Sequence, residues 1–205
     1  EQTTEAIRQA REEAELMAGL QISEAWIGIA GSHVRSFDSQ GMVAIRNKEI
    51  TPADIHRVIE AAKAVTVPTD REVMHVLPRE FKVDDQDGVL DPRGMSGVRL
   101  EASVHIVTVG KSALQNVVKC AEKAGLRVAG VVLEQYASGL SVLTADEKQL
   151  GVALVDIGGG SSDLVIFTQG SLAYSASIPL GGSHITNDIA VGLRTPHASA
   201  EHLKK

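Results

Sequence analysis

The sequence has few aromatic residues, a single cysteine and no long apolar run. Aromatic residues fill 3% of the 205 positions although 43% are hydrophobic, so a core must be built mainly from Val, Ile, Leu and Ala. The one cysteine, Cys120, excludes an internal disulfide framework. No apolar run approaches the roughly 20 residues of a membrane-spanning helix, and no signal-peptide pattern stands at the start. We therefore expect one or two globular domains in the cytoplasm.

The charge balance and the acidic stretches also narrow the choice. The formal net charge is −6, which argues against a general nucleic-acid binder, because such proteins usually present a basic face. The acidic stretch DDQDG at 84–88 lacks the spacing of an EF-hand, so it is expected to lie in a solvated loop. The seven histidines show no metal-ligand spacing and are expected to be ordinary polar or surface residues.

Apolar periodicity predicts a mixed α/β chain. Helices are expected over 4–18, from 51 onward, and over 111–124, 135–143, 183–191 and 197–203. Strands are expected over 25–30, 34–37, 42–45, 72–77, 81–83, 98–108, 127–133, 151–157, 164–167 and 171–178, and a loop over 84–97. Strands dominate about residues 30–108, whereas helices and strands alternate on either side. The middle of the chain could therefore be an insertion into the flanking domain.

The longest expected strand, 98–108, alternates apolar and polar residues. Leu100 and Val104 fall on one face, whereas Arg99 and His105 fall on the other. This period of two is typical of a half-buried strand.

The segment VALVDIGGGSSDLVIF, residues 152–167, places three glycines and two serines between two apolar strands. Glycine allows a positive φ and lets a ligand approach the backbone closely, and consecutive N–H groups can converge on an anion. Asp156, at the end of the first strand, is suited to hold Mg²⁺ through water. These features predict a Mg-nucleotide phosphate site made of Asp156 and the residues Gly158, Gly159, Gly160, Ser161 and Ser162.

Three different structures with glycine turns fit this segment less well. A plain hairpin needs one or two glycines rather than three. A Walker loop would continue with GK[ST], and a dinucleotide fingerprint would lead into a helix rather than a strand. The plain hairpin nevertheless remains an open alternative.

The motif DIGGGSSD resembles the second phosphate motif of the actin-like ATPase superfamily. The stretches AELMAGLQISEAWIGIAGSHV, SVLTADEKQLGVALVDIGGGSSDL and ITNDIAVGLRTPHASAEHLK resemble the FtsA family of bacterial cell-division proteins, and the resemblance extends along almost the whole chain. It implies an incomplete actin-like (ribonuclease-H-like) ATPase fold of the α/β class with an inserted α+β subdomain. Residues 1–29 and 109–148 would belong to the first actin-like subdomain, 30–108 to the insertion, and 149–205 to the start of the second domain.

The resemblance also implies that this chain is an internal fragment. The family's first phosphate motif would precede Glu1, and the adenosine-binding half and the membrane-attaching helix would follow Lys205. Only part of an ATP clamp would be present, so we expect weak or undetectable ATP binding and no useful hydrolysis. Gly181-Gly182-Ser183 is interpreted as a turn into the helix at 183–191, with Ser183 as its cap; an adenosine glycine pair is the alternative.

Three further acids are candidates near this site. Glu134, in VVLEQYASGL, resembles a chaperone-type segment in which a Glu positions the attacking water; a solvated acid in a first helical turn is the alternative. Asp163 could support the ligand-binding residues from behind or cap the strand end. Asp188 is expected on a helix surface; a polar group near the phosphates is the alternative.

The implied function is an ATP-binding scaffold of cell division, at most a weak ATPase. Its expected place is the cytoplasmic face of the inner membrane at the division site, where it would form filaments and link FtsZ and other division proteins to the membrane. Nucleic acid is not an expected partner. A PilM-like pilus-assembly adaptor and a catalytically active actin-like or chaperone-like ATPase remain as alternatives.

Overall fold

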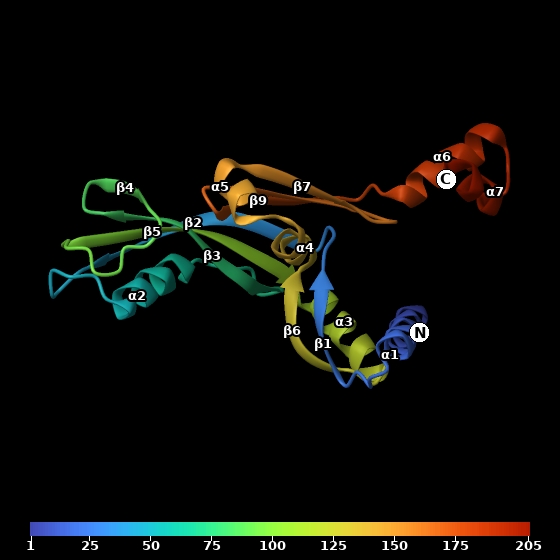
Figure 1. Ribbon diagram of the computed structural model, residues 1–205, viewed down its shortest axis with the longest axis horizontal. Helices are drawn as coiled ribbons and strands as arrows, with labels where there is room; N and C mark the ends of the chain where they lie inside the picture. Colours follow the sequence, from blue (N-terminus) through green and yellow to red (C-terminus); the bar gives the residue numbers. More distant parts are fainter.

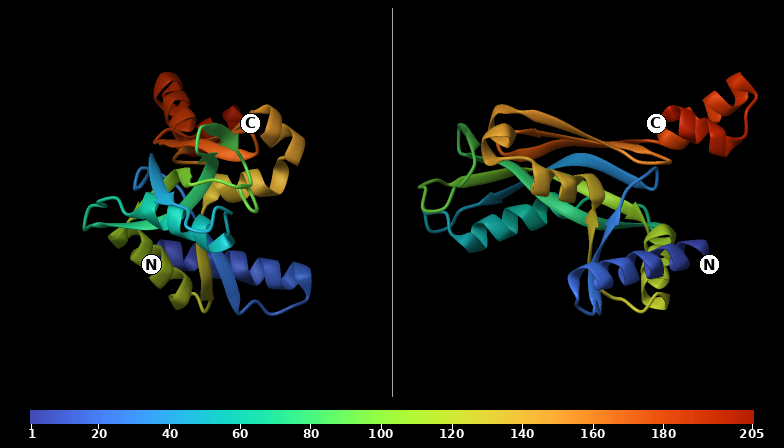
Figure 2. Two further views of the ribbon diagram at one scale, coloured as in Figure 1. Left: turned by 90° about the vertical axis from the view of Figure 1, so that its left-hand side faces the viewer. Right: turned by 45° about the vertical axis from the view of Figure 1, so that its right-hand side comes forward.

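Three β-sheets organise the chain in the computed structural model, which describes residues 1–205 (Figure 1). One has four strands in the order β2-β5-β3-β4, one has three in the order β7-β8-β9, and one is the pair β1-β6. The four-stranded sheet and the three-stranded sheet lie against each other, and the β1-β6 pair lies below their junction (Figures 1 and 2). The architecture is the mixed α/β arrangement that the sequence predicts.

The four-stranded antiparallel sheet carries the largest core. Its strands are β2 (Val34–Ala44), β3 (Arg71–Val83), β4 (Gln86–Val89) and β5 (Arg99–Gly110), and helix α2 (Pro52–Lys63) covers one face. Thr51 and Asp54 form a capping box at the start of α2. Gly41 lies directly beneath α2, where a Cβ would meet the backbone of Val58 and Ala62. Only glycine therefore lets the helix approach this strand so closely.

The strands of this sheet differ from the sequence prediction in three places. The segments 34–37 and 42–45 join into the single strand β2, and 72–77 and 81–83 join into β3 with an irregularity near Pro78. Pairing with β5 along the whole length outweighs the local break signals of glycine and proline. The expected loop 84–97 contains the short strand β4, which can be polar because it lies at the sheet edge.

The alternation of residues in β5 predicted that its polar face would be solvated. In the structure, part of that face is buried. His105 and Thr108 are each about 2% exposed, because β9 packs against β2, β3 and β5. Of the two settings expected for the histidines, ordinary polar or surface residues, His105 is therefore a buried polar residue and not a surface one.

The β1-β6 pair is parallel and supports two helices. Its strands are β1 (Glu24–Ile29) and β6 (Arg127–Leu133), and the helices are α1 (Gln2–Ala18) and α3 (Lys111–Lys123). Arg11 of α1 donates a hydrogen bond to the carbonyl of Ala124, which ends α3.

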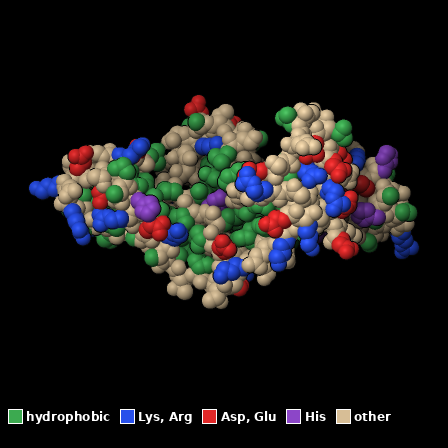
Figure 3. Space-filling model, turned by 90° about the horizontal axis from the view of Figure 1, so that it is seen from below, with side chains coloured by type: hydrophobic (Ala, Val, Ile, Leu, Met, Phe, Trp, Pro, Cys, Tyr) green, Lys and Arg blue, Asp and Glu red, His purple; other side chains and the backbone are tan.

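The face in Figure 3 gathers hydrophobic side chains near the middle of the molecule, with charged side chains around them.

The remaining part of the chain is a three-stranded antiparallel meander with flanking helices. Its elements are α4 (Glu134–Val142), α5 (Ala145–Leu150), β7 (Val152–Ile157), β8 (Ser162–Thr168), β9 (Ser171–Ile178), α6 (Gly182–Leu193) and α7 (His197–Lys204). Val165, Phe167 and Leu172 form its core. Helices α6 and α7 pack on each other and extend beyond the end of the sheet (Figures 1 and 2). None of the helices has both the length and the apolar character that crossing a membrane requires.

Candidate functional site

The glycine turn is the loop of the β7-β8 hairpin. Ile157 pairs with Ser162, and the N–H of Gly158 donates to the carbonyl of Ser161 at 2.9 Å, which closes a four-residue loop. The amides of Gly159, Gly160 and Ser161 donate to no protein atom. Three adjacent N–H groups are therefore available to an anion.

The three glycines do not adopt the positive φ that their sequence suggested. A Cβ on Gly160 would meet no heavy atom within 4 Å, and one on Gly159 would meet only the Oγ of Ser183 at 3.5 Å. Neither the backbone conformation nor the packing inside the protein therefore requires glycine at these two positions. Close approach of an external group is the remaining physical reason for leaving out the side chain.

A second glycine pair packs against the first turn. A Cβ on Gly181 would lie 2.5 Å from the carbonyl oxygen of Gly158. The N–H groups of Gly182 and Ser183 donate to the carbonyls of Gly158 and Gly159 at 2.9 and 2.8 Å. The turn thus satisfies free N–H groups at the start of α6. Gly181-Gly182 forms the expected turn into a helix, but Ser183 is not its cap, because α6 begins one residue earlier at Gly182.

Three acidic side chains come together beside the turn from three elements. Asp156 of β7 lies directly opposite Asp163 of β8 in the ladder, so the two carboxylates share one face of the sheet. Burial of the Glu134 carboxyl, at the start of α4, raises its pKa, and the charges of Asp156 and Asp163 raise that pKa further. Opposed like charges destabilise a strand pair, so this site favours a cation.

The hydrogen bonds give the acids different roles. Asp163 is 5% exposed and accepts hydrogen bonds from the Ser161 hydroxyl at 2.9 Å and the Gly31 amide at 3.3 Å. It therefore holds the glycine turn against the turn that follows β1. Asp156 is only partly buried and accepts from the Ser138 hydroxyl at 3.2 Å, which leaves its other oxygen free. Asp188 is exposed on α6, as expected.

No group of three His, Cys, Asp or Glu side chains is close enough to ligate a metal ion directly. The residues present still fit a hydrated divalent cation, because Asp156 has an unpaired carboxylate oxygen and lies opposite a second carboxylate in the strand ladder. Mg²⁺ keeps several of its waters when proteins bind it.

Two residues near the site carry no sequence signal that identified them. His75 of β3 accepts a hydrogen bond from the Leu133 amide, which immediately precedes Glu134; burial lowers the pKa of His75 and so favours the neutral, accepting ring. Lys204 of α7 donates to the carbonyl of Gly182 at 3.2 Å and pairs with Glu201 at 2.7 Å. The spacing of Glu201 and Lys204 predicts only a local helical pair, not a positive charge beside the glycine turns.

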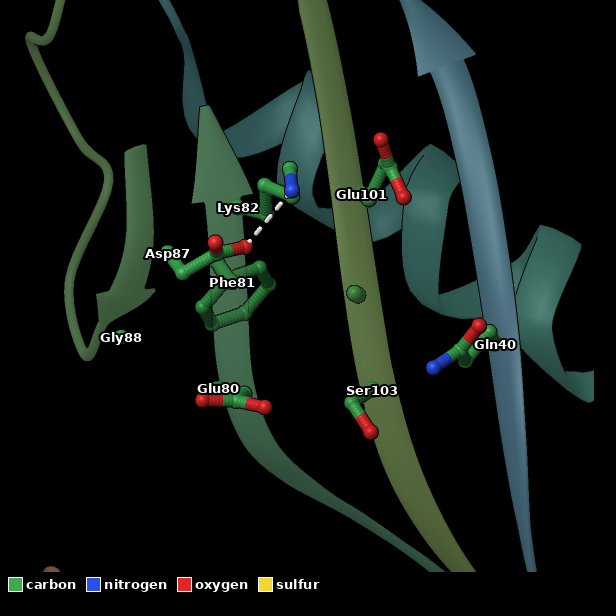
Figure 4. Close-up of a pocket in the computed structure, with 9 residues that line it drawn as sticks. Gln40, Glu80, Phe81, Lys82, Asp87, Gly88, Glu101 and Ser103 are labelled. Atoms are coloured by element: carbon green, nitrogen blue, oxygen red, sulfur yellow. Dashed lines mark ion pairs between the residues drawn. The ribbon is translucent and has the colours of Figure 1, made fainter. Parts of the chain in front are cut away.

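A separate pocket lies on the face of the four-stranded sheet opposite α2, away from the glycine turn. Its volume is about 80 Å³ and its lining includes Glu80, Lys82, Asp87 and Glu101. Lys82 and Asp87 form an ion pair of 2.8 Å between β3 and β4 (Figure 4). The internal pairing and the small volume make this pocket unsuitable for a nucleotide.

Comparisons with known proteins agree with this architecture. A family model described as the SHS2 domain inserted in FtsA matches residues 31–108, and a model of cell division protein FtsA matches residues 153–205. Cell division protein FtsA of Pseudomonas aeruginosa is 53% identical over 204 residues, which is 100% of this chain and 49% of that protein. FtsA of Neisseria meningitidis is 48% identical over 202 residues, 98% of this chain and 49% of that protein. The chain spans about half the length of the curated relatives it matches.

A solved structure of a PilM-PilN type IV pilus biogenesis complex has a similar fold. The TM-score is 0.66, with 19% identity, over 97% of this chain and 55% of that chain. At this identity the likeness concerns the fold alone. The chain thus shares the mixed α/β fold of that structure, and its residues 31–108 match the SHS2 domain inserted in FtsA.

Proposed function

The chain belongs to the FtsA family of cell division proteins, and we propose that it supplies the glycine-turn side of an ATP site to a cell-division scaffold. The observation that carries this proposal is the state of Gly159 and Gly160. Their amides donate to no protein atom, and nothing in the protein requires them to lack a side chain. A bound phosphate explains both facts, because its oxygens accept from free amides and need close access to the backbone.

Each residue of the site then has a defined task. The amides of Gly159, Gly160 and Ser161 donate to phosphate oxygens, and Gly158 closes the loop through Ser161. Asp156 would hold Mg²⁺ through water, and the ion would supply positive charge against the phosphates. The Ser161 hydroxyl is already held by Asp163, and the Ser162 hydroxyl donates to the Leu180 carbonyl at 2.7 Å. The two serines therefore shape the turn. Because both hydroxyl protons are donated within the protein, these hydroxyls can accept a hydrogen bond from a ligand but have no proton left to donate to it.

We propose that Glu134 positions the water that attacks the terminal phosphate. Its carboxyl lies in the field of Asp156 and Asp163, and its raised pKa favours proton uptake relative to an ordinary Glu. An acid in that state can orient a water and accept its proton. No other residue of the site shares that task, so the activity is at most that of a weak ATPase. This chain contains one wall of the proposed cleft, so it should bind ATP weakly or not detectably by itself.

Family membership supports the proposed scaffold role. Residues 1–29 and 109–148 are proposed to form the first actin-like subdomain, 149–205 the start of the second, and 30–108 an inserted interaction subdomain. Its strand β2 has a free edge of 11 residues, which is suited to pairing with another chain. We propose that the whole protein forms filaments at the cytoplasmic face of the inner membrane and links FtsZ and other division proteins to it.

Calorimetry with Mg-ATP tests the site. The titration is run on this chain and on a chimera in which the chain replaces the matching half of the Pseudomonas aeruginosa relative. We expect saturable binding by the chimera, a loss of at least tenfold in affinity in Asp156→Ala, and little or no binding by the chain alone. Equal affinity of the parent chimera and the Asp156→Ala chimera would remove Asp156 from the site.

A further inference from the structure

A polar junction joins the inserted sheet to the second sheet. Ser36 of β2 donates to the backbone carbonyl of Ser175 on β9 at 3.0 Å, and the two hydroxyls also lie 3.0 Å apart. The His105 Nε2 of β5 lies 3.0 Å from the same Ser175 hydroxyl. Three strands from two sheets therefore meet through polar side chains where an apolar interface would be expected.

The junction extends outward to a partly exposed carboxylate. The Nδ1 of His105 lies 2.7 Å from Asp38, and Asp38 also pairs with Arg79 at 2.7 Å. His105 as a whole is only 2% exposed. His105 thus links a surface ion pair to a buried hydroxyl.

Asp38, His105 and Ser175 have the order of a Ser-His-Asp triad, but they do not form a hydrolytic site. The Ser175 hydroxyl borders a cavity of only about 20 Å³. Such a space holds about one water molecule and no acyl substrate. The arrangement is therefore a connection between sheets.

Two of the residues that line the cavity beside Ser175 carry a polar atom without a hydrogen-bond partner. The lining of this cavity includes Ser36, Ser175, Ser177 and Gln135, the second residue of α4. The Oε1 of Gln135 and the Oγ of Ser177 are buried and form no hydrogen bond within the protein, and Gln135 is 1% exposed. Buried polar groups without partners are costly, and native proteins satisfy nearly all of them.

We propose that this cavity binds one ordered water molecule, which joins α4 to the polar junction of Ser36, Ser175, His105 and Asp38. One O–H of the water donates to Gln135 Oε1, and its oxygen accepts from the Ser177 hydroxyl. The second O–H reaches the hydroxyl of Ser36 or Ser175. The water then joins three elements at one point: the inserted sheet, β9 and the helix that starts at Glu134. This proposal does not depend on nucleotide binding.

Water-to-protein NOE spectroscopy of this chain, together with a high-resolution crystal structure, tests the site. We expect a negative, long-lived water NOE to the side-chain amide of Gln135 and density for one water within hydrogen-bond distance of Gln135 and Ser177. A dry cavity in both measurements overturns the proposal.

The role in joining the elements is tested with Gln135→Met, which keeps the side-chain length and removes the polar atoms. Amide hydrogen exchange in β9 should become at least tenfold faster, and the density for a water beside Ser177 should be absent from a crystal structure of the variant. The control Gln149→Met, on the exposed surface of α5, should change neither. Unchanged exchange in Gln135→Met overturns the joining role.

A second variant covers the case in which Gln135→Met does not fold. Ser177→Ala removes one partner of the water, and we expect a weaker water NOE together with faster exchange in β9. An unaltered water NOE and unaltered exchange in Ser177→Ala overturn the proposed binding geometry.

Discussion

Replacing Gly160 by alanine separates a phosphate-binding turn from a plain hairpin. The new Cβ would have no heavy atom within 4 Å, and the φ of Gly160 lies outside the left-handed region. At such positions, Gly-to-Ala changes stabilise proteins by about 0.4–1 kcal/mol through the unfolded state. The free energy of unfolding should therefore stay constant or rise by up to about 1 kcal/mol.

Nucleotide binding should respond in the opposite direction. A methyl group on Gly160 would stand between the backbone and a phosphate, so we expect Mg-ATP affinity to fall at least tenfold, or about 1.4 kcal/mol. Urea unfolding of this chain measures the stability, and calorimetry of the chimera with the Pseudomonas aeruginosa relative measures the affinity. The matched control is Gly192→Ala, because Gly192 also has nothing within 4 Å but lies on α6, away from the turn; it should leave the affinity unchanged. A destabilised Gly160→Ala with normal affinity would show that the glycine serves the hairpin alone.

Four further predictions concern stability. Glu134→Gln should stabilise the chain at neutral pH, because the pKa of Glu134 is raised in the folded state and its ionised carboxylate therefore costs stability above the ordinary pKa. The gain should be less than about 1 kcal/mol, because the group is partly exposed. Urea titrations across pH 3–8 should show the difference between the two proteins vanishing in acid. Thr51→Ala should lower the free energy of unfolding by about 1 kcal/mol, because the cap of α2 is lost. The pKa of Asp54 is lowered to about 2, so its contribution to stability should be present above pH 3.8 and lost as the pH falls toward 2. Chemical unfolding of the wild type and Asp54→Asn across this pH range measures that contribution. Gly41→Ala should destabilise by about 3 kcal/mol or prevent folding, because its Cβ meets the backbone of α2; a wild-type melting temperature would contradict this packing.

The sequence was informative where local chemistry decides the structure. The TPAD segment at Thr51 starts a helix with a capping box, as expected, because the cap is made within four residues. The glycine turn between two strands was also predictable, since an apolar run stands on each side of the glycines. Only the family resemblance predicted that Glu134 lies near the glycine turn, because no local sequence pattern indicates this contact.

Tertiary contacts decided what the sequence could not show. The alternation in β5 placed His105 on the polar face correctly, but only the packing of β9 on that face buries the ring. Likewise, β2 and β3 continue through Gly41 and Pro78 because each pairs with β5 on one side. The free amides of the turn are visible only once every backbone hydrogen bond has been assigned.

The most direct test of the proposed site is an NMR titration of the chimera, with this chain's segment isotopically labelled, against Mg-ATP. Amide resonances of Gly159, Gly160 and Ser161 should shift downfield and saturate together, as expected for N–H groups that donate to phosphate oxygens, and Asp156→Ala should weaken that response. Saturation of nucleotide binding with these three amides unmoved would contradict the proposal that the glycine turn holds the phosphates.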